Sequence, residues 1–133
     1  MSADRIRYFD SSALVKLLRE EPETAAVRAL VGRSSARYAS ALVRAEVPRA
    51  LRRHGPRARA RAQLLVEELD LIEIDDVLLD QAALVGGAGL RTLDAIHLAS
   101  ALALRDDLEG FVTYDQRLAA AADAEGFRVE SPR

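Results

Sequence analysis

Cysteine is absent from this chain of 133 residues, and histidine occurs only twice, at His54 and His97. The lack of cysteine excludes disulfide bonds, thiol chemistry and zinc sites with Cys ligands. Two histidines are also too few for a His-rich metal site. Any metal site must therefore be built from oxygen ligands, chiefly Asp and Glu, which suit Mg²⁺ or Mn²⁺.

Long apolar runs are missing as well, and no apolar segment stands near the N-terminus. No stretch approaches the length of a membrane-spanning helix, and no signal segment is recognisable. We therefore expect a cytoplasmic protein. Because the chain is long enough for one hydrophobic core, residues 1–133 are expected to form a single domain.

Aromatic residues make up only 5% of the chain and tryptophan is missing, although half of the residues are hydrophobic. This composition favours a core of Ala, Leu, Val and Ile between helices and a sheet. The formal net charge of −2 argues against a generally basic nucleic-acid binder. However, residues 44–61 contain seven arginines and a single acid, a local charge of +6, so the remainder carries −8.

Strand-like and helix-like segments alternate along the chain, and no hairpin dipeptide joins consecutive strands. The alternation predicts an α/β fold, with a parallel sheet covered by helices on both faces. Gly126 is expected to follow the last helix as its C′ residue. The expected strands cover residues 6–9, 37–39, 71–74, 110–114 and 127–129. The expected helices cover residues 13–18, 23–31, 41–53, 57–69, 77–85, 93–104 and the segment from Asp115 to about 125.

Four acidic residues stand where a strand ends or a helix begins. Asp10 directly follows the strand 6–9, and Asp115 directly follows the strand 110–114. The carboxyl ends of parallel strands meet at one edge of a sheet, where ligands bind. Asp94 lies in the first turn of a helix for which Thr92 is the expected N-cap, and Glu46 lies about two turns beyond Ser40. Four buried carboxylates at one edge would need a cation to balance them.

Three of these acids have an ordinary structural explanation. Asp10 and Asp115 are good helix N-caps, and Asp94 can complement the dipole of its helix. The coincidence of all four acids favours a metal site over separate capping roles.

Glu46 and His97 also have ordinary explanations. Glu46 alone would more commonly be a solvated residue that pairs with Arg49 or Arg53. His97 is more typical of a hydrogen-bonded core histidine than of a metal ligand. Pro48 is expected to remove one hydrogen bond from the helix that carries Glu46 and to favour a kink there.

Four segments together resemble the PIN domain family, and more closely the VapC-type toxins of bacterial toxin–antitoxin pairs. The most specific is LRTLDAIHLA at residues 90–99. The others are YFDSSALVK at 8–16, SALVRAE at 40–46 and FVTYDQRL at 111–118. They follow one another in the family's order and span nearly the whole chain.

The resemblance implies a three-layer α/β/α fold with a central parallel sheet of four to five strands. It implies a metal-dependent endoribonuclease that holds Mg²⁺ or Mn²⁺ through four acids and is neutralised by a VapB-like antitoxin. It also implies a homodimer that forms a hetero-oligomer with this antitoxin. The implied metal ligands are Asp10, Glu46, Asp94 and Asp115, and the implied supporting polar residues are Thr113, Ser11 and Ser12.

Cleavage by such a site would be hydrolysis of RNA by a metal-activated water, leaving a 5′-phosphate and a 3′-hydroxyl. An acidic site repels RNA, so positive charge is needed nearby. Arg49, Arg52 and Arg53 are candidates for contact with RNA phosphates. The same arginines could instead form a solvated face or contact an acidic segment of the antitoxin.

Two other functions compete with a toxin. A PIN nuclease outside toxin–antitoxin systems, acting in RNA processing, would carry the same acids. A receiver-like phosphoacceptor signalling domain has a similar length and fold class, but Asp10 is not part of an acidic pair and Lys16 lies in the first helix. A phosphatase of the haloacid dehalogenase type would need an Asp where Ser12 stands.

Overall fold

The computed structural model describes residues 5–133 and contains a five-stranded sheet in which all neighbouring strands are parallel. The strand order is β3-β2-β1-β4-β5, so β1 lies at the centre. The strands are β1 (Ile6–Phe9), β2 (Ala36–Ser40), β3 (Asp70–Ile72), β4 (Leu108–Val112) and β5 (Val129–Glu130).

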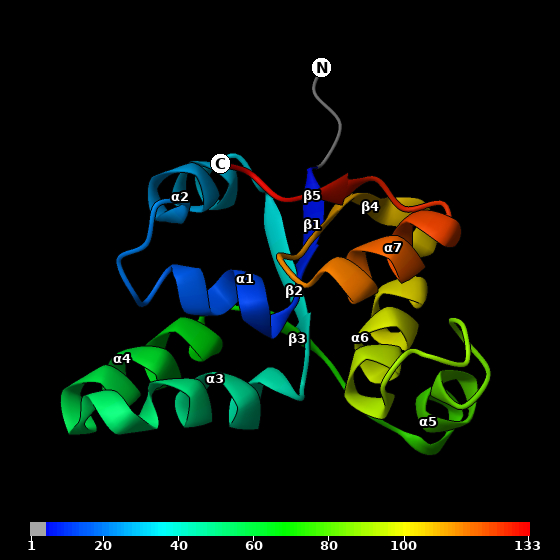
Figure 1. Cartoon of the computed structure of the whole chain (residues 1–133), viewed down its shortest axis with the longest axis horizontal. Coiled ribbons are helices and arrows are strands. Elements are labelled where there is room, and N and C mark those ends of the chain that lie inside the picture. The colour runs from blue at the N-terminus through cyan, green and yellow to red at the C-terminus, as the bar shows by residue number, and fades with distance from the viewer. Residues whose placement is uncertain (1–4) are drawn as a thin grey trace.

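Helices cover both faces of this sheet, with α1 to α4 on one side and α5 to α7 on the other (Figure 1). The helices are α1 (Ser11–Lys16), α2 (Thr24–Gly32), α3 (Val43–Leu51), α4 (Pro56–Glu67), α5 (Asp76–Ala82), α6 (Thr92–Leu102) and α7 (Gln116–Ala124). Short 3₁₀ turns, η1 (Arg52–His54) and η2 (Arg105–Asp107), follow α3 and precede β4. The predicted three-layer α/β/α fold with a parallel sheet is confirmed.

The alternation of side chains along β1 divides the core between the two faces. Phe9 packs with Leu14 of α1 and Val47 of α3 on one face. Tyr8 packs on the other face with Leu98 of α6 and Phe111 of β4, against which its ring stacks. Successive residues of a strand point to opposite faces, so β1 joins both halves of the core and holds Asp10 at its end.

Strand order reverses between β1 and β4. From β1 the chain builds outward through β2 and β3, and then returns to place β4 and β5 on the opposite side of β1. In open α/β sheets this switch point is where the carboxyl ends of the strands leave room for a ligand. The segments that follow β1 and β4 are held together here by a hydrogen bond from the Asp10 backbone N–H to the Val112 carbonyl (3.2 Å).

Several predicted element ends are wrong at the residue level. The strand predicted at 110–114 ends at Val112, so Asp115 comes three residues after β4 and not directly after it. The last strand is shifted from 127–129 to Val129–Glu130, because Phe127 N–H bonds to the Ala122 carbonyl and thereby caps α7. Gly126 has a positive φ of 95°, as the prediction of a C′ glycine requires.

One predicted helix cap and one predicted helix start are also wrong. Thr92 is the first helical residue of α6, and the extended Arg91 is the N-cap, without a side-chain capping bond. Helix α3 begins at Val43, later than predicted, and Ser40 accepts a hydrogen bond from Leu42 N–H in the preceding turn (3.1 Å). The helix continues through Pro48 to Leu51. Within residues 5–133, no helix combines the length and the apolar character needed to cross a bilayer.

Candidate active site

Asp10 is buried at the end of β1, with only 2% of its surface exposed. It is the N-cap of α1, and its Oδ1 accepts hydrogen bonds from Ala13 N–H (3.0 Å) and Ser12 Oγ (2.7 Å). Its Oδ2 accepts a short hydrogen bond from the Thr113 hydroxyl. Burial raises the pKa of Asp10, while these three donors, which stabilise the ionised form, work in the opposite direction.

Thr113 and Ser12 connect Asp10 to the segment after β4. The Thr113 hydroxyl oxygen accepts a hydrogen bond from Asp115 N–H (3.0 Å), and Ser12 Oγ accepts one from Tyr114 N–H (2.9 Å). Asp115 is in turn the N-cap of α7, where its Oδ1 accepts from the backbone of Arg117 and Leu118. These hydrogen bonds fix the positions of the two N-cap residues, Asp10 and Asp115, relative to each other.

Asp94 is half-buried in the first turn of α6. Its pKa is raised first by burial and then by the negative charges of Asp115 and Glu46, while His97 and Arg91 act in the opposite direction. The repulsion by Asp115 and Glu46 means that α6, α7 and α3 bring these three carboxylates into one electrostatic neighbourhood. Asp10 belongs to the same neighbourhood because His97 also lowers its pKa.

Glu46 projects from α3 toward α6 and contacts His97. Its Oε1 lies 2.8 Å from Nε2 of His97, and Nδ1 of the same ring lies 2.6 Å from the Tyr8 hydroxyl. His97 and Tyr8 are both buried. The ordinary alternative, in which Glu46 pairs with Arg49 or Arg53, is therefore wrong, whereas the prediction of His97 as a hydrogen-bonded core residue is confirmed.

The negative charge of these acids is only weakly compensated. Among residues 5–133, no Arg or Lys forms an ion pair with Asp10, Glu46, Asp94 or Asp115, and His97 is the only titratable partner. Other acids do have such partners, for example Glu130, which pairs with Arg7 at 2.8 Å. A concentration of carboxylates without cationic side chains is the donor set that hard divalent ions prefer.

The four acids do not form a closed metal cage by themselves. Within residues 5–133, no three His, Asp or Glu side chains are grouped closely enough to hold an ion together. The chemistry of the donors nevertheless fits Mg²⁺ or Mn²⁺, because every one is a carboxylate and two have pKa values raised by burial. Repulsion between unneutralised carboxylates, as between Asp94 and Asp115, favours a more open arrangement.

The remaining predicted residues fall into two groups. Thr113 and Ser12 contact Asp10 directly, while no side-chain hydrogen bond of Ser11 occurs among residues 5–133. Arg49, Arg52 and Arg53 are exposed on α3 and η1, with no ion pair to any other residue of the described part of the chain.

Sequence reasoning missed the contacts of Tyr8 and His97 with the site. His97 carries a detectable signal, because it is a polar residue within the apolar run of α6 and follows Asp94 by three residues, about one helical turn. Tyr8 carries no such signal in the sequence, since a tyrosine in a buried strand is ordinary.

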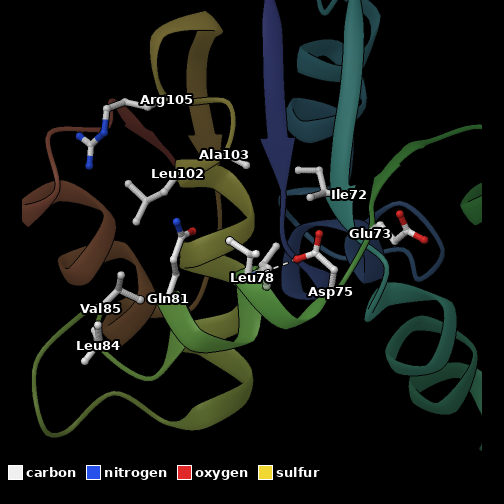
Figure 2. Close-up of a pocket in the computed structure, with 11 residues that line it drawn as sticks. Ile72, Glu73, Asp75, Leu78, Gln81, Leu84, Val85, Leu102, Ala103 and Arg105 are labelled. Atoms are coloured by element: carbon white, nitrogen blue, oxygen red, sulfur yellow. Dashed lines mark hydrogen bonds between the residues drawn. The ribbon is translucent and has the colours of Figure 1, made fainter.

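A hollow of about 580 Å³ lies away from the acids, between α5, the end of α6 and β3. Figure 2 shows Leu78, Gln81 and Val85 of the α5 region facing Leu102 across it. None of the four acids lines this hollow. This hollow is therefore separate from the candidate site.

Acids at the switch point of a parallel sheet limit the families to which this chain can belong. Comparison with known proteins identifies the family. The PIN domain family matches residues 7–124, which include all four acids. The chain belongs to the PIN domain family. The predicted family is therefore confirmed, and it argues against a receiver domain or a haloacid dehalogenase.

Relatives within the PIN family give a closer placement. The chain is 46% identical to ribonuclease VapC46 of Mycobacterium tuberculosis over 125 residues, which cover 94% of this chain and 96% of that protein. It is 41% identical to ribonuclease VapC47 of the same species over 130 residues, with the same coverage. The prediction of a VapC-type ribonuclease is thus confirmed at the level of the family.

Solved structures of other proteins share the fold. VapC20 of M. tuberculosis, described as a toxin that cleaves the sarcin–ricin loop, has a TM-score of 0.72 at 20% identity and covers 96% of this chain and 99% of its own. A toxin–antitoxin complex from Klebsiella pneumoniae also has a TM-score of 0.72, at 22% identity, and covers 99% of this chain and 98% of its own. At these identities the likeness concerns the fold alone.

Proposed function

We propose that this chain is a metal-dependent endoribonuclease toxin, folded as one domain, which a cognate VapB-like antitoxin neutralises. The observation that carries the proposal is the set of four carboxylates, from four segments of a PIN fold, that lack Arg or Lys partners in the described residues. Ribonucleases of the VapC type are the relatives most informative for the substrate.

The metal ligands in this proposal are Asp10, Glu46, Asp94 and Asp115, which would hold Mg²⁺ or Mn²⁺. When bound, such an ion supplies a water of lowered pKa and neutralises charge on the phosphate. Oδ1 of Asp10 already accepts two hydrogen bonds, but Oδ2 accepts only the one from Thr113 and keeps a further lone pair for a cation. Thr113 and Ser12 fix the direction of the Asp10 carboxylate.

The side chains of the site favour direct hydrolysis over attack by the ribose 2′-hydroxyl. The latter route needs a free general base and acid near the scissile phosphate. His97 is buried with both ring nitrogens engaged, and His54 is exposed on η1. We therefore expect products that end in a 5′-phosphate and a 3′-hydroxyl.

The exposed arginines of α3 and η1 are the proposed contacts for RNA phosphates. Arg49 lies on the same helix as Glu46, and Arg52 and Arg53 follow at its end. Replacing all three by alanine should weaken RNA binding, and should reduce the slope of log affinity against log salt by about one for each phosphate that is no longer bound. An unchanged slope would assign this face to solvent or to an acidic segment of the antitoxin.

The proposed partners are RNA, the antitoxin and a second copy of the chain, and we expect the protein to meet RNA and the antitoxin in the cytoplasm. Large exposed apolar side chains support a homodimer, since Val77 and Leu79 of α5 and the following Leu84 are 66%, 44% and 85% exposed. Leu84→Glu should give a monomer by light scattering after gel filtration. A dimer that persists would move the interface elsewhere.

The enzymatic proposal is tested by cleavage of RNA with the purified chain. EDTA should abolish cleavage and Mn²⁺ should restore it, and the mapped ends should carry a 5′-phosphate. Cleavage that resists EDTA, or full activity of the double variant Asp10→Asn and Asp94→Asn, would contradict the assignment. A PIN nuclease of RNA processing would cleave in the same way, but its expression would not arrest growth in a manner that an adjacent antitoxin gene reverses.

A further inference from the structure

We propose that His97 is a positioning residue that directs the Glu46 carboxylate into the acidic site, with Tyr8 holding the imidazole in the required orientation. The role rests on the proposed function, because it concerns the ion that Glu46 would bind. It assigns a purpose to two buried polar side chains that neither bind RNA nor serve as metal ligands.

Hydrogen-bond chemistry fixes the direction of this chain of contacts. A carboxylate can only accept, so the His97 Nε2 that lies 2.8 Å from Glu46 Oε1 must carry the hydrogen. In the neutral ring Nδ1 is then the acceptor, and the Tyr8 hydroxyl, 2.6 Å away, donates to it. Tyr8 therefore holds the ring in the orientation in which Nε2 presents a donor to Glu46.

This arrangement leaves one face of the carboxylate available. Only Oε1 of Glu46 is engaged by His97, and no hydrogen bond to Oε2 occurs among residues 5–133. The His97 side chain is 2% exposed and that of Glu46 is 22% exposed, so the contact is anchored in the core while the carboxylate reaches the surface of the site. A carboxylate with one oxygen fixed and the other open is prepared to bind an ion.

The same three residues join the segments that carry Asp10 and Asp94. Tyr8 stands two residues before Asp10 on β1, and His97 lies one turn after Asp94 on α6. Glu46 comes from α3, which contains Pro48 two residues later and therefore lacks one backbone hydrogen bond near the carboxylate. The contact with His97 fixes the orientation of the Glu46 side chain, which a helix that lacks this hydrogen bond holds less firmly.

A core histidine without a role in the site would need only to satisfy its own polar atoms. His97 could do so through Tyr8 and a nearby backbone carbonyl. Ser100, on the same helix, satisfies its hydroxyl in this local way by donating to the Ile96 carbonyl. Its Nε2 instead reaches Glu46, 51 residues away in sequence, on another helix. Partners of this kind behind a metal ligand orient it and tune its affinity for the ion.

Two amides at position 97 separate positioning from packing. In His97→Gln the amide nitrogen occupies the place of Nε2 and can donate to Glu46, whereas in His97→Asn it lies near Nδ1 and cannot reach. We expect Mn²⁺ affinity of the RNA-free chain, measured by electron paramagnetic resonance, to fall about 10- to 100-fold in the Asn variant and only about threefold in the Gln variant. Val27→Ala, a buried change on α2, controls for general destabilisation and should leave the affinity unchanged.

A double-mutant cycle with Glu46→Ala tests whether His97 acts through Glu46. On that background His97→Asn should cause no further loss of Mn²⁺ affinity, because the group that it orients is gone. The role of His97 is overturned if the Asn variant binds Mn²⁺ as wild type does, if Gln is as weak as Asn, or if the loss persists without Glu46. A wild-type chain that neither binds Mn²⁺ nor cleaves RNA would overturn the proposed function together with this role.

Discussion

Asp10 and Asp94 belong to one acidic site, but the fold holds their carboxylates in different ways. Asp10 is 2% exposed and accepts hydrogen bonds from Ala13, Ser12 and Thr113. Asp94 is half-buried, and what raises its pKa besides burial is the charge of other carboxylates, above all Asp115. Asp10 is held in place by hydrogen bonds, whereas Asp94 is repelled by the neighbouring carboxylates.

This difference teaches that capping and metal binding are not alternatives at Asp10. Its N-cap contacts place the carboxylate at the switch point and hold it there without an ion. Among the described residues Asp94 has no comparable hydrogen bonds, and its ionised form is poorly stabilised until a cation is present. The comparison predicts that the two residues are alike in catalysis and unlike in folding.

The largest effect should be on catalysis, where Asp10→Asn and Asp94→Asn are expected to behave alike. Each should lower metal-dependent RNA cleavage at least about 100-fold, because loss of a residue behind a metal ligand already costs up to that factor. Initial rates at saturating Mn²⁺ measure the effect. Both variants should retain the far-ultraviolet circular dichroism of the wild type.

A result in which only one variant loses activity would break the comparison. If Asp94→Asn remained active while Asp10→Asn did not, Asp94 would have to be removed from the proposed ligand set. Ala124→Glu, which adds a carboxylate at the exposed end of α7 far from Asp115, serves as a charge control and should cleave like the wild type.

The second effect is on stability, where the two residues should differ. Asp10→Ala removes a helix cap and leaves the Thr113 hydroxyl and Ala13 N–H without their acceptor in a buried place, at an expected cost of about 2 kcal/mol in the free energy of unfolding. Asp94→Ala should change this free energy by no more than about 0.5 kcal/mol. Urea denaturation in EDTA measures both, and equal losses would show that Asp94 is also structural.

Much of this site can be predicted from local sequence. Asp10 follows a strand and precedes a helix, and the α/β alternation puts that junction at the carboxyl edge of the sheet. Asp94 lies in the first turn of its helix, as predicted, even though the predicted cap is wrong, because a shift of one residue does not move it out of that turn. The exact end of β4 escapes prediction, since the backbone leaves the strand after Val112 to bring Thr113 to Asp10.

The partner of Glu46 cannot be predicted in this way. Local reasoning favours Arg49 and Arg53, which are neighbours on a helix surface. The actual partner, His97, belongs to α6, far from α3 in sequence, and meets Glu46 only through the fold. Long-range contacts between side chains depend on how elements pack, which periodicity and capping rules do not contain.

The smallest expected effect is on the pH dependence of stability, and it tests whether ionised Asp94 destabilises the folded chain. The pKa of Asp94 is raised above its ordinary 3.8 in the folded chain, so without metal its ionised form opposes folding at neutral pH. Asp94→Asn should then be more stable than wild type at pH 7, by less than about 1 kcal/mol because the group is partly solvated. As the pH falls through the folded pKa this advantage should shrink, and below 3.8 it should vanish, because the carboxyl is protonated in both states.

Asp10→Asn should show the same direction of pH dependence, since the pKa of Asp10 is also raised, but with a different offset. The stability of this variant also changes by a constant amount, because an amide replaces the carboxylate that accepts a hydrogen bond from the Thr113 hydroxyl. Within residues 5–133, Asp94 has no such bond to lose. Unfolding by urea between pH 3.5 and 7 in EDTA gives both curves. If the Asp94→Asn advantage grew as the pH fell, the ionised carboxylate of Asp94 would not be the form that burial and the neighbouring acids disfavour in the folded chain.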